Sequence, residues 1–240
     1  MTSSLLRVPI AFLQSGECTL SADTSKYVLR VHRLVAGDRF VAFDPEQEKE
    51  AEAEVVRADR LAEIRVEPLR VASQLPKRDV TVIQALAKGS KVDAIVRDAT
   101  ELGATRIFVV VAERSVKREV SDAQRNRWRR IAVEAARQCG RGDVPRIVVG
   151  GSLTEALPGV AAEGGVALCL HPRAEMSVSE GLAQLSPDGS MAMLIGPEGG
   201  LVDRELDAAV ANGFVMAKLG GFVLRAETVC AAVLGALAAR

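Results

Sequence analysis

The sequence contains few aromatic residues and no excess of either charge. Aromatic residues occupy 3% of the 240 positions, which argues against a surface that binds single strands by stacking many successive bases. The 31 basic residues balance the 31 acidic ones, so a polyanionic partner has to meet a local basic patch. With 48% hydrophobic residues, the composition is that of a globular protein with a sizeable core.

Cysteine and histidine are also sparse, and their spacing does not suit a metal ion. The four cysteines are far apart, form no CxxC pair and have only His32 and His171 as possible companions. We therefore predict no metal site and four reduced thiols. The chain also has no apolar run of about 18 residues and no signal-like start, so we predict no membrane span, no export and a cytoplasmic location.

The first part of the chain, residues 5–71, has the alternating pattern of short strands. The expected strands are residues 5–10, 39–44, 49–58 and 61–70. In the third of these, alternation places small apolar residues such as Ala53 and Val55 on the face opposite glutamates such as Glu54. This region therefore reads as a small antiparallel β domain.

A helical pattern interrupts these strands at residues 23–34. Its apolar stripe consists of Tyr27, Val28, Val31 and Leu34, and its outward cations are Lys26, Arg30 and Arg33. The cations either form a solvated face or bind a polyanionic backbone, and the pattern leaves both interpretations open.

A polar link at residues 73–79 separates this region from one with a different pattern. Buried strands then alternate with amphipathic helices, which indicates a largely parallel sheet covered on both faces. The expected strands are residues 80–86, 106–112, 146–151, 166–171, 191–196 and 214–220, and the helix at 91–103 has Val92, Ile95, Val96, Ala99 and Leu102 at helical spacing. We therefore predict an α/β protein with domains at residues 1–73 and 76–240.

Three of these strands end in loops marked by glycine and proline, "CLHPRA", "LIGPEGGL" and "KLGGFVLRAET". Ligands of open parallel sheets bind beyond the carboxyl ends of the strands, so these loops are the candidate site. One such loop alone would be an ordinary strand-to-helix turn, whereas three together favour a site. Phosphate-binding GK[ST] and dinucleotide-binding GxGxxG patterns are absent, and Glu198 would repel a phosphate.

Two side chains in these loops are candidates for chemistry. His171, at a strand end, is either structural or part of the pocket. Arg225 offers planar hydrogen-bond donors at the mouth of the site, and its alternative role is a salt bridge to Glu227 or Glu198. Residues 113–146 add ten Lys or Arg against five Asp or Glu, a local basic stretch that includes "RNRWRR". Its arginines either bind an anionic backbone or form the solvated face of a helix.

Together these motifs resemble the ribosomal RNA small subunit methyltransferase E family of the SPOUT, or trefoil-knot, class. The resemblance covers nearly the whole chain, with "YVLRVHRLVAGDRFVAFD", "KGSKVDAIVRDATELGATRIFVVVAERSV", "AARQCGRGDVPRI", "LHPRA", "LIGPEGGL" and "LGGFVLRAET" in order. It implies a PUA-like β-barrel domain for RNA docking and a C-terminal SPOUT α/β-knot domain. It also implies a homodimer that transfers a methyl group from S-adenosylmethionine to N3 of a uridine in 16S ribosomal RNA.

The resemblance also assigns roles to individual residues. Contacts to S-adenosylmethionine are expected from Leu170, His171, Leu194, Gly196, Pro197, Gly199, Gly200, Leu219, Gly220, Val223 and Leu224. Contacts to RNA are expected from Arg30, Arg33, Lys88, Lys91, Arg114, Gln138 and Arg141. Arg225 is the candidate catalytic residue, because it can stabilise the negative charge that develops on uracil oxygens as the N3 proton leaves. The proton acceptor stays open among Glu198, Glu227 and solvent.

The third loop departs from the family pattern. Gly221 and Phe222 replace a proline and an arginine, and Ala226 replaces a threonine, whereas Arg225 and Glu227 match. These departures concern the expected RNA contacts more than a cofactor pocket formed by main chain. Two alternatives therefore remain: a related SPOUT enzyme that methylates a ribose 2′-hydroxyl or another base, and a non-catalytic RNA-binding assembly factor. The apolar terminal helix, residues 229–239, is consistent with burial in the core and in a dimer.

Overall fold

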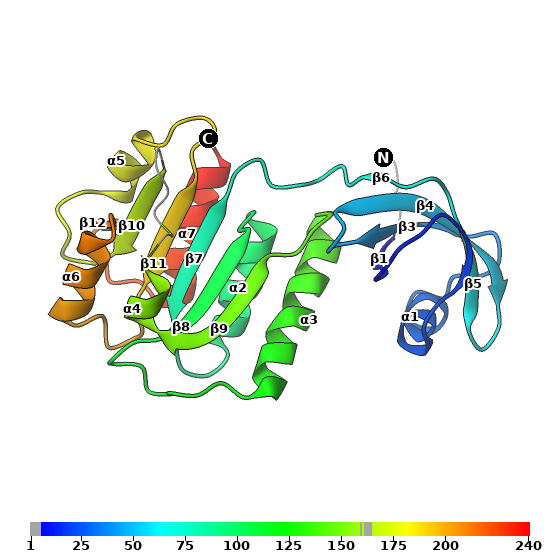
Figure 1. The fold of residues 1–240 in the computed structure, drawn as a ribbon, viewed down its shortest axis with the longest axis horizontal. Coiled ribbons are helices and arrows are strands. Elements are labelled where there is room, and N and C mark those ends of the chain that lie inside the picture. Colours follow the sequence, from blue (N-terminus) through cyan, green and yellow to red (C-terminus); the bar gives the residue numbers. More distant parts are fainter. Residues whose placement is uncertain (1–5, 159, 161–164) are drawn as a thin grey trace. The chain divides into compact units, whose positions relative to one another are not determined.

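The chain forms two compact units in a computed structural model that describes residues 6–158, 160 and 165–240 (Figure 1). Leu5, where the first strand was expected to begin, lies outside the described residues. One unit comprises residues 1–75 and 136–144, and the other comprises residues 76–135 and 145–240. The sequence pattern did not predict that the segment 136–144 joins the first unit.

The first unit contains a six-stranded sheet. Its strands are β1 (Arg7–Pro9), β2 (Gly16–Thr19), β3 (Arg39–Asp44), β4 (Lys49–Ala58), β5 (Ala62–Val66) and β6 (Arg70–Val71), in the order β1-β3-β4-β5-β2 with β6 beside β4. The expectation of an antiparallel domain was wrong at one edge, because β1 and β3 are parallel, and β2 was not predicted. The described pairings run from β1 to β2 without closing, so the PUA-like barrel stays a prediction.

The helical insert of this unit differs from the regular helix that was predicted. α1 (Ala22–Lys26) continues into a π-helical turn, η1 (Tyr27–Val31). A π turn bonds residues five apart instead of four, so it shifts the side chains that follow around the axis. Val28 is buried and Leu29 packs against the core, whereas Val31, predicted on the apolar stripe, is 61% exposed. The cations Lys26, Arg30 and Arg33 are exposed, as predicted.

The second unit is built on a six-stranded sheet whose neighbouring strands are all parallel, as predicted (Figure 1). The strands are β7 (Val80–Ala85), β8 (Arg106–Val111), β9 (Arg146–Ser152), β10 (Val166–Leu170), β11 (Met191–Ile195) and β12 (Val215–Ala217). Their order is β12-β10-β11-β7-β8-β9. The three strands that precede the glycine- and proline-marked loops are therefore adjacent, and their carboxyl ends lie at the same edge.

Helices cover both faces of this parallel sheet. Neighbouring residues of β7 face opposite ways, so Val82 belongs to one hydrophobic cluster and Ile83 to the other. The first cluster includes residues of α2 (Lys91–Glu101), α3 (Asp122–Cys139), α5 (Val178–Ala183) and α7 (Ala226–Ala238), and the second includes residues of α4 (Leu153–Ala156) and α6 (Asp203–Ala211). The apolar character of α7 thus follows in large part from core burial. No helix in the described part of the chain is long and apolar enough to span a membrane.

Candidate active site

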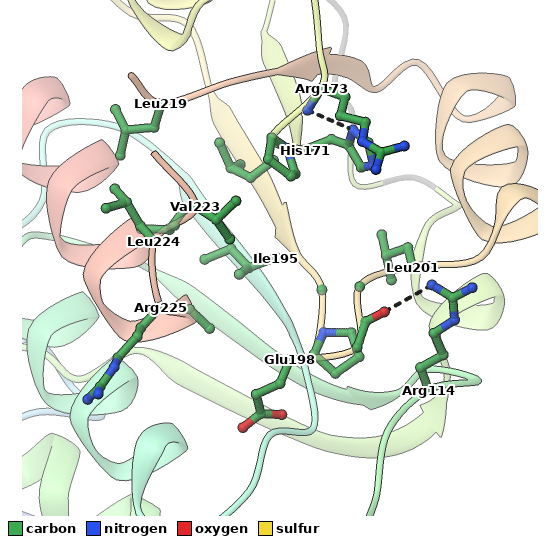
Figure 2. A pocket seen from close by; sticks show the side chains of 18 of the residues that line it. Arg114, His171, Arg173, Ile195, Glu198, Leu201, Leu219, Val223, Leu224 and Arg225 are labelled. Carbon is green, nitrogen blue, oxygen red and sulfur yellow. Dashed lines mark hydrogen bonds between the residues drawn. The ribbon is translucent and has the colours of Figure 1, made fainter. Parts of the chain in front are cut away.

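The loops that follow β10, β11 and β12 surround one cavity of about 720 Å³ (Figure 2). Its lining includes residues 170–173, 195–201, 219–220 and 222–226. The loops meet because their strands are parallel neighbours, and the ends of parallel strands open on the same edge. The structure therefore brings together the three corners that the sequence singled out.

Ten of the eleven residues expected to contact a methyl donor line this cavity. They are Leu170, His171, Gly196, Pro197, Gly199, Gly200, Leu219, Gly220, Val223 and Leu224. Leu194 is the exception, because its side chain is fully buried in the cluster on the α4 and α6 face. Its successor Ile195 faces the other way and lines the cavity, which is the ordinary alternation of a strand.

Charged side chains hold the loop after β11 from two sides. The Glu198 carboxylate accepts a hydrogen bond of 2.8 Å from Lys91 Nζ and one of 3.1 Å from the backbone N–H of Lys88. Arg114 donates to the carbonyl of Gly199 at 2.9 Å, as Figure 2 shows. Partial burial alone would raise the pKa of Glu198, but the hydrogen bonds outweigh it and lower this pKa below its ordinary value. Glu198 is therefore a weak base and a poor proton acceptor.

Two buried polar side chains support the same loop. The amide of Gln84, in β7, donates to the carbonyl of Gly196 at 3.4 Å. The Glu205 carboxylate accepts from the backbone N–H of Val202 at 3.1 Å and from that of Glu113 at 2.8 Å, so it fixes the start of α6 to the loop after β8. With these contacts the backbone of the β11 loop is positioned before any ligand binds.

The loop after β12 is held much less. Phe222 and Val223 are 85% and 83% exposed, although both are apolar and both line the cavity. Within the described part of the chain, no hydrogen bond joins residues 219–224 to other segments. Arg225 is exposed and makes no ion pair with any described residue, so the alternative salt bridges to Glu227 or Glu198 are not formed.

The cavity carries more positive than negative side chains. Its charged lining residues are the cations Lys91, Arg114, Arg173 and Arg225 and the carboxylates Glu198 and Asp203. This local excess is concealed in a chain whose formal net charge is zero. Sequence reasoning missed Arg173, although its position directly after Pro172 in "LHPRA" placed it in a candidate loop. In Figure 2 it lies beside His171, whose Nδ1 accepts a hydrogen bond from the Arg173 backbone at 3.2 Å.

Comparison with known proteins decides the family. A model of the RNA methyltransferase domain matches residues 73–238. The ribosomal RNA small subunit methyltransferase E of a Synechocystis species is 33% identical over 230 residues, which cover 92% of this chain and 73% of that protein. The chain belongs to the ribosomal RNA small subunit methyltransferase E family.

Two solved structures extend this comparison to the fold. The family member from Neisseria gonorrhoeae, crystallised with S-adenosylmethionine, is 26% identical with a TM-score of 0.85 and covers 97% of this chain and 96% of its own. A structure from Legionella pneumophila with bound S-adenosylmethionine is 25% identical with a TM-score of 0.85 and covers 99% and 98%. The predicted α/β methyltransferase fold is confirmed, whereas the knot stays a prediction.

The predicted RNA contacts occupy different environments in this family member. Lys91 and Arg114 line the cavity, where both already hold the β11 loop, and Lys88 is exposed beside them. In the first unit, Arg30, Arg33 and Gln138 are exposed. The environment of these six side chains leaves their assignment to RNA a prediction.

Arg141 differs from the other predicted RNA contacts. Its guanidinium donates to both carboxylate oxygens of Asp143, at 2.6 and 2.8 Å, and its side chain is 6% exposed. A planar guanidinium in a buried bidentate pair has few N–H donors left to bind a phosphate. The structure therefore corrects the expectation for Arg141, which stabilises the segment 136–144 instead of presenting a free charge.

The arginines of α3 have different environments. Arg127 pairs with Asp93 of α2 at 2.8 Å, and the adjacent Trp128 is buried and donates to the same carboxylate at 2.9 Å. Arg129 and Arg130 are exposed. Arg127 thus serves helix packing, whereas for the exposed Arg129 and Arg130 both interpretations stay open.

The cysteines do not contribute reactive groups to the site. All four are free, and burial raises the pKa of the Cys169 and Cys230 thiols to about 12. Such thiols stay protonated and are poor nucleophiles. Among the described residues, no group of three or more His, Cys, Asp or Glu side chains is arranged to hold a metal ion.

Proposed function

We propose that this protein methylates N3 of a uridine in 16S ribosomal RNA, with S-adenosylmethionine as the donor, as a cytoplasmic homodimer. The observation that carries the proposal is the meeting of three strand-end loops around one cavity with a positively charged rim, in a chain of this family. The related structures that contain S-adenosylmethionine support the choice of donor.

The residues present fit S-adenosylmethionine. A volume of about 720 Å³ lies within the usual range for ligand pockets. Leu170, Ile195, Leu219 and Val229 supply apolar walls for the adenosine and the methylene groups. Gly220 has a φ of +69°, and a Cβ there would meet no atom within 4 Å, so the space beside it is open to a ligand. When bound, the donor supplies a methyl carbon already activated by positively charged sulfur.

This chain's own residues then have to align the base and stabilise charge. Alignment of a nucleophile can lower the activation free energy of a reaction by roughly several kcal/mol. Arg225 occupies the N-cap of α7 and has no ion-pair partner among the described residues, so it can donate to the uracil oxygens on which negative charge develops. We therefore keep Arg225 as the proposed catalytic residue.

The contacts of two carboxylates bear on the choice of proton acceptor. Glu198 is held ionised by Lys91 and Lys88, which makes it a weak base. Glu227 lies two residues after Arg225, and its Oε2 is buried without a hydrogen-bond donor among the described residues. Because Glu227 does not line the cavity, a proton from the base would have to reach it through solvent or through a movement of the loop. Glu227 or solvent therefore accepts the N3 proton in this proposal.

The target uridine has to be unpaired or turned out of its stack, because N3 lies on the Watson–Crick edge. The cations on the cavity rim would hold the phosphates on either side of it. Free access to this edge, as well as sequence, would then select the substrate.

Transfer of labelled methyl groups tests the proposal directly. The protein is incubated with labelled donor and with either 30S subunits or naked 16S ribosomal RNA from cells that lack the modification. We expect label in 16S ribosomal RNA and a modified nucleoside with the mass and retention of N3-methyluridine. A 2′-O-methylated or other methylated nucleoside would point to a related SPOUT activity, and absence of donor binding in calorimetry would point to a non-catalytic assembly factor.

A further inference from the structure

Phe222 presents an exposed apolar ring at the cavity. It is 85% exposed, it lines the cavity, and no other Phe, Tyr or Trp does so among the described residues. The flanking residues Gly221 and Val223 are also exposed, so neither covers the ring. A ligand that covers the ring would remove this apolar surface from water.

The charges around Phe222 indicate what kind of ligand covers it. Arg173 and Arg225 line the same cavity, are exposed, and have side chains without an ion-pair partner in the described part of the chain. A flat apolar ring that shares one cavity with two such guanidinium groups is suited to a nucleotide, whose base stacks on the ring while its phosphates meet the cations. The alternative occupant is a second copy of this chain, and sedimentation of the variants below distinguishes the two.

We infer that Phe222 is the platform on which the target base stacks when it enters the cavity. This inference rests on the proposed function and adds to it a substrate-binding residue. Stacking of the uracil on Phe222 would leave its edge accessible to Arg225, three residues along the same loop. Phe222 would therefore position the base, and Arg225 would act on it.

Three substitutions separate stacking from other roles of the ring. Phe222→Ala removes the ring, Phe222→Leu keeps apolar bulk without it, and Phe222→Trp keeps an aromatic face. Val210→Ala is the control, because Val210 is a 53% exposed apolar residue of α6 outside the cavity lining. Each variant is compared with the wild type in donor affinity by calorimetry, in KM for ribosomal RNA and kcat, and in sedimentation.

Loss of the ring should weaken RNA binding and leave the affinity for the methyl donor unchanged. We expect Phe222→Ala and Phe222→Leu to raise the KM for RNA roughly 5- to 150-fold, the range for loss of one stacked base, with donor affinity changed less than twofold. Phe222→Trp and Val210→Ala should behave like the wild type. With an RNA fragment that carries an abasic site in place of the methylated uridine, wild type and Phe222→Ala should bind equally well.

Several outcomes would overturn the inference. Phe222→Leu acting like the wild type, an equal loss of donor affinity, or dissociation of a dimer by Phe222→Ala would assign the ring to apolar packing, to the donor or to a second copy. If the wild type bound the donor but methylated no ribosomal RNA, the proposed function would fail separately. Binding of a short oligouridylate and of an abasic oligomer of equal length, by wild type and Phe222→Ala, would then still decide whether the ring stacks on bases.

Discussion

The loop after β11 and the loop after β12 form two walls of the same cavity but are held in different ways. The first, residues 196–201, is fixed by Gln84, by Arg114 and by the pair of Glu198 with Lys91. The second, residues 219–225, exposes Phe222 and Val223, and its Arg225 has no ion-pair partner among the described residues. We call them the fixed wall and the open wall.

This difference matches two tasks in the proposed reaction. A binding site for a donor benefits from a backbone that is already in place, because little ordering has to occur on binding. A segment with few internal contacts costs little to rearrange, which suits a large substrate that has to enter and leave. We therefore assign donor affinity mainly to the fixed wall and RNA recognition and turnover mainly to the open wall.

The largest effect should come from Arg225 in the open wall. Arg225→Ala should lower kcat by roughly 100- to 1,000-fold, as for loss of a donor to a developing negative charge, while donor affinity stays within about threefold. Single-turnover methylation and calorimetry measure the two quantities. Arg225→Lys, which keeps the charge without the planar fork, is the matched variant and should be intermediate. An equal loss of turnover and donor affinity would refute the assignment.

The next largest effect should come from the backbone of the fixed wall. Gly200 has a φ of +72°, a conformation that a β-branched residue adopts at a cost of about 1–3 kcal/mol. Gly200→Val should therefore weaken donor binding roughly 5- to 150-fold in calorimetry. Gly213→Val is the control, because Gly213 has a φ of +83° after α6 but does not line the cavity. It should lower the melting temperature without a comparable loss of donor affinity.

A smaller effect is expected from Arg173, which lies on the loop after β10. If its free guanidinium contacts a phosphate, Arg173→Ala should weaken RNA binding several-fold and reduce the salt dependence of binding by about one unit of log affinity per log salt. Arg97→Ala is the control, because Arg97 pairs with Asp98 and does not line the cavity, and it should leave this slope unchanged. Identical slopes for Arg173→Ala and the wild type would show that the rim of the cavity does not bind the RNA backbone.

The sequence predicted the parallel sheet and the converging loops because both depend on local patterns. Continuous apolar runs define buried strands, and the loops bear their own glycine and proline marks. It did not predict the exposure of Val31, because a π turn changes the spacing of side chains without an evident mark in the sequence. Nor did it show that Lys91 holds Glu198 or that Arg141 holds Asp143, since both pairs depend on tertiary packing or side-chain geometry.

The smallest expected effect concerns the ion pair of Glu198 with Lys91, which stabilises the fixed wall. Because the folded protein lowers the pKa of Glu198, the pair stabilises the ionised form, and its contribution is present at neutral pH and lost as the pH falls through the lowered pKa. Half-exposed pairs contribute roughly 0.2–1 kcal/mol, so Glu198→Gln and Lys91→Met should each weaken donor binding only up to about fivefold. In a double-mutant cycle the two losses should not add, because either substitution removes the same contact. Melting temperatures are measured from pH 7 down to pH 3, and those of the wild type and Glu198→Gln should converge at the acid end. A constant difference in melting temperature would mean that protonation of Glu198 does not break its ion pair with Lys91.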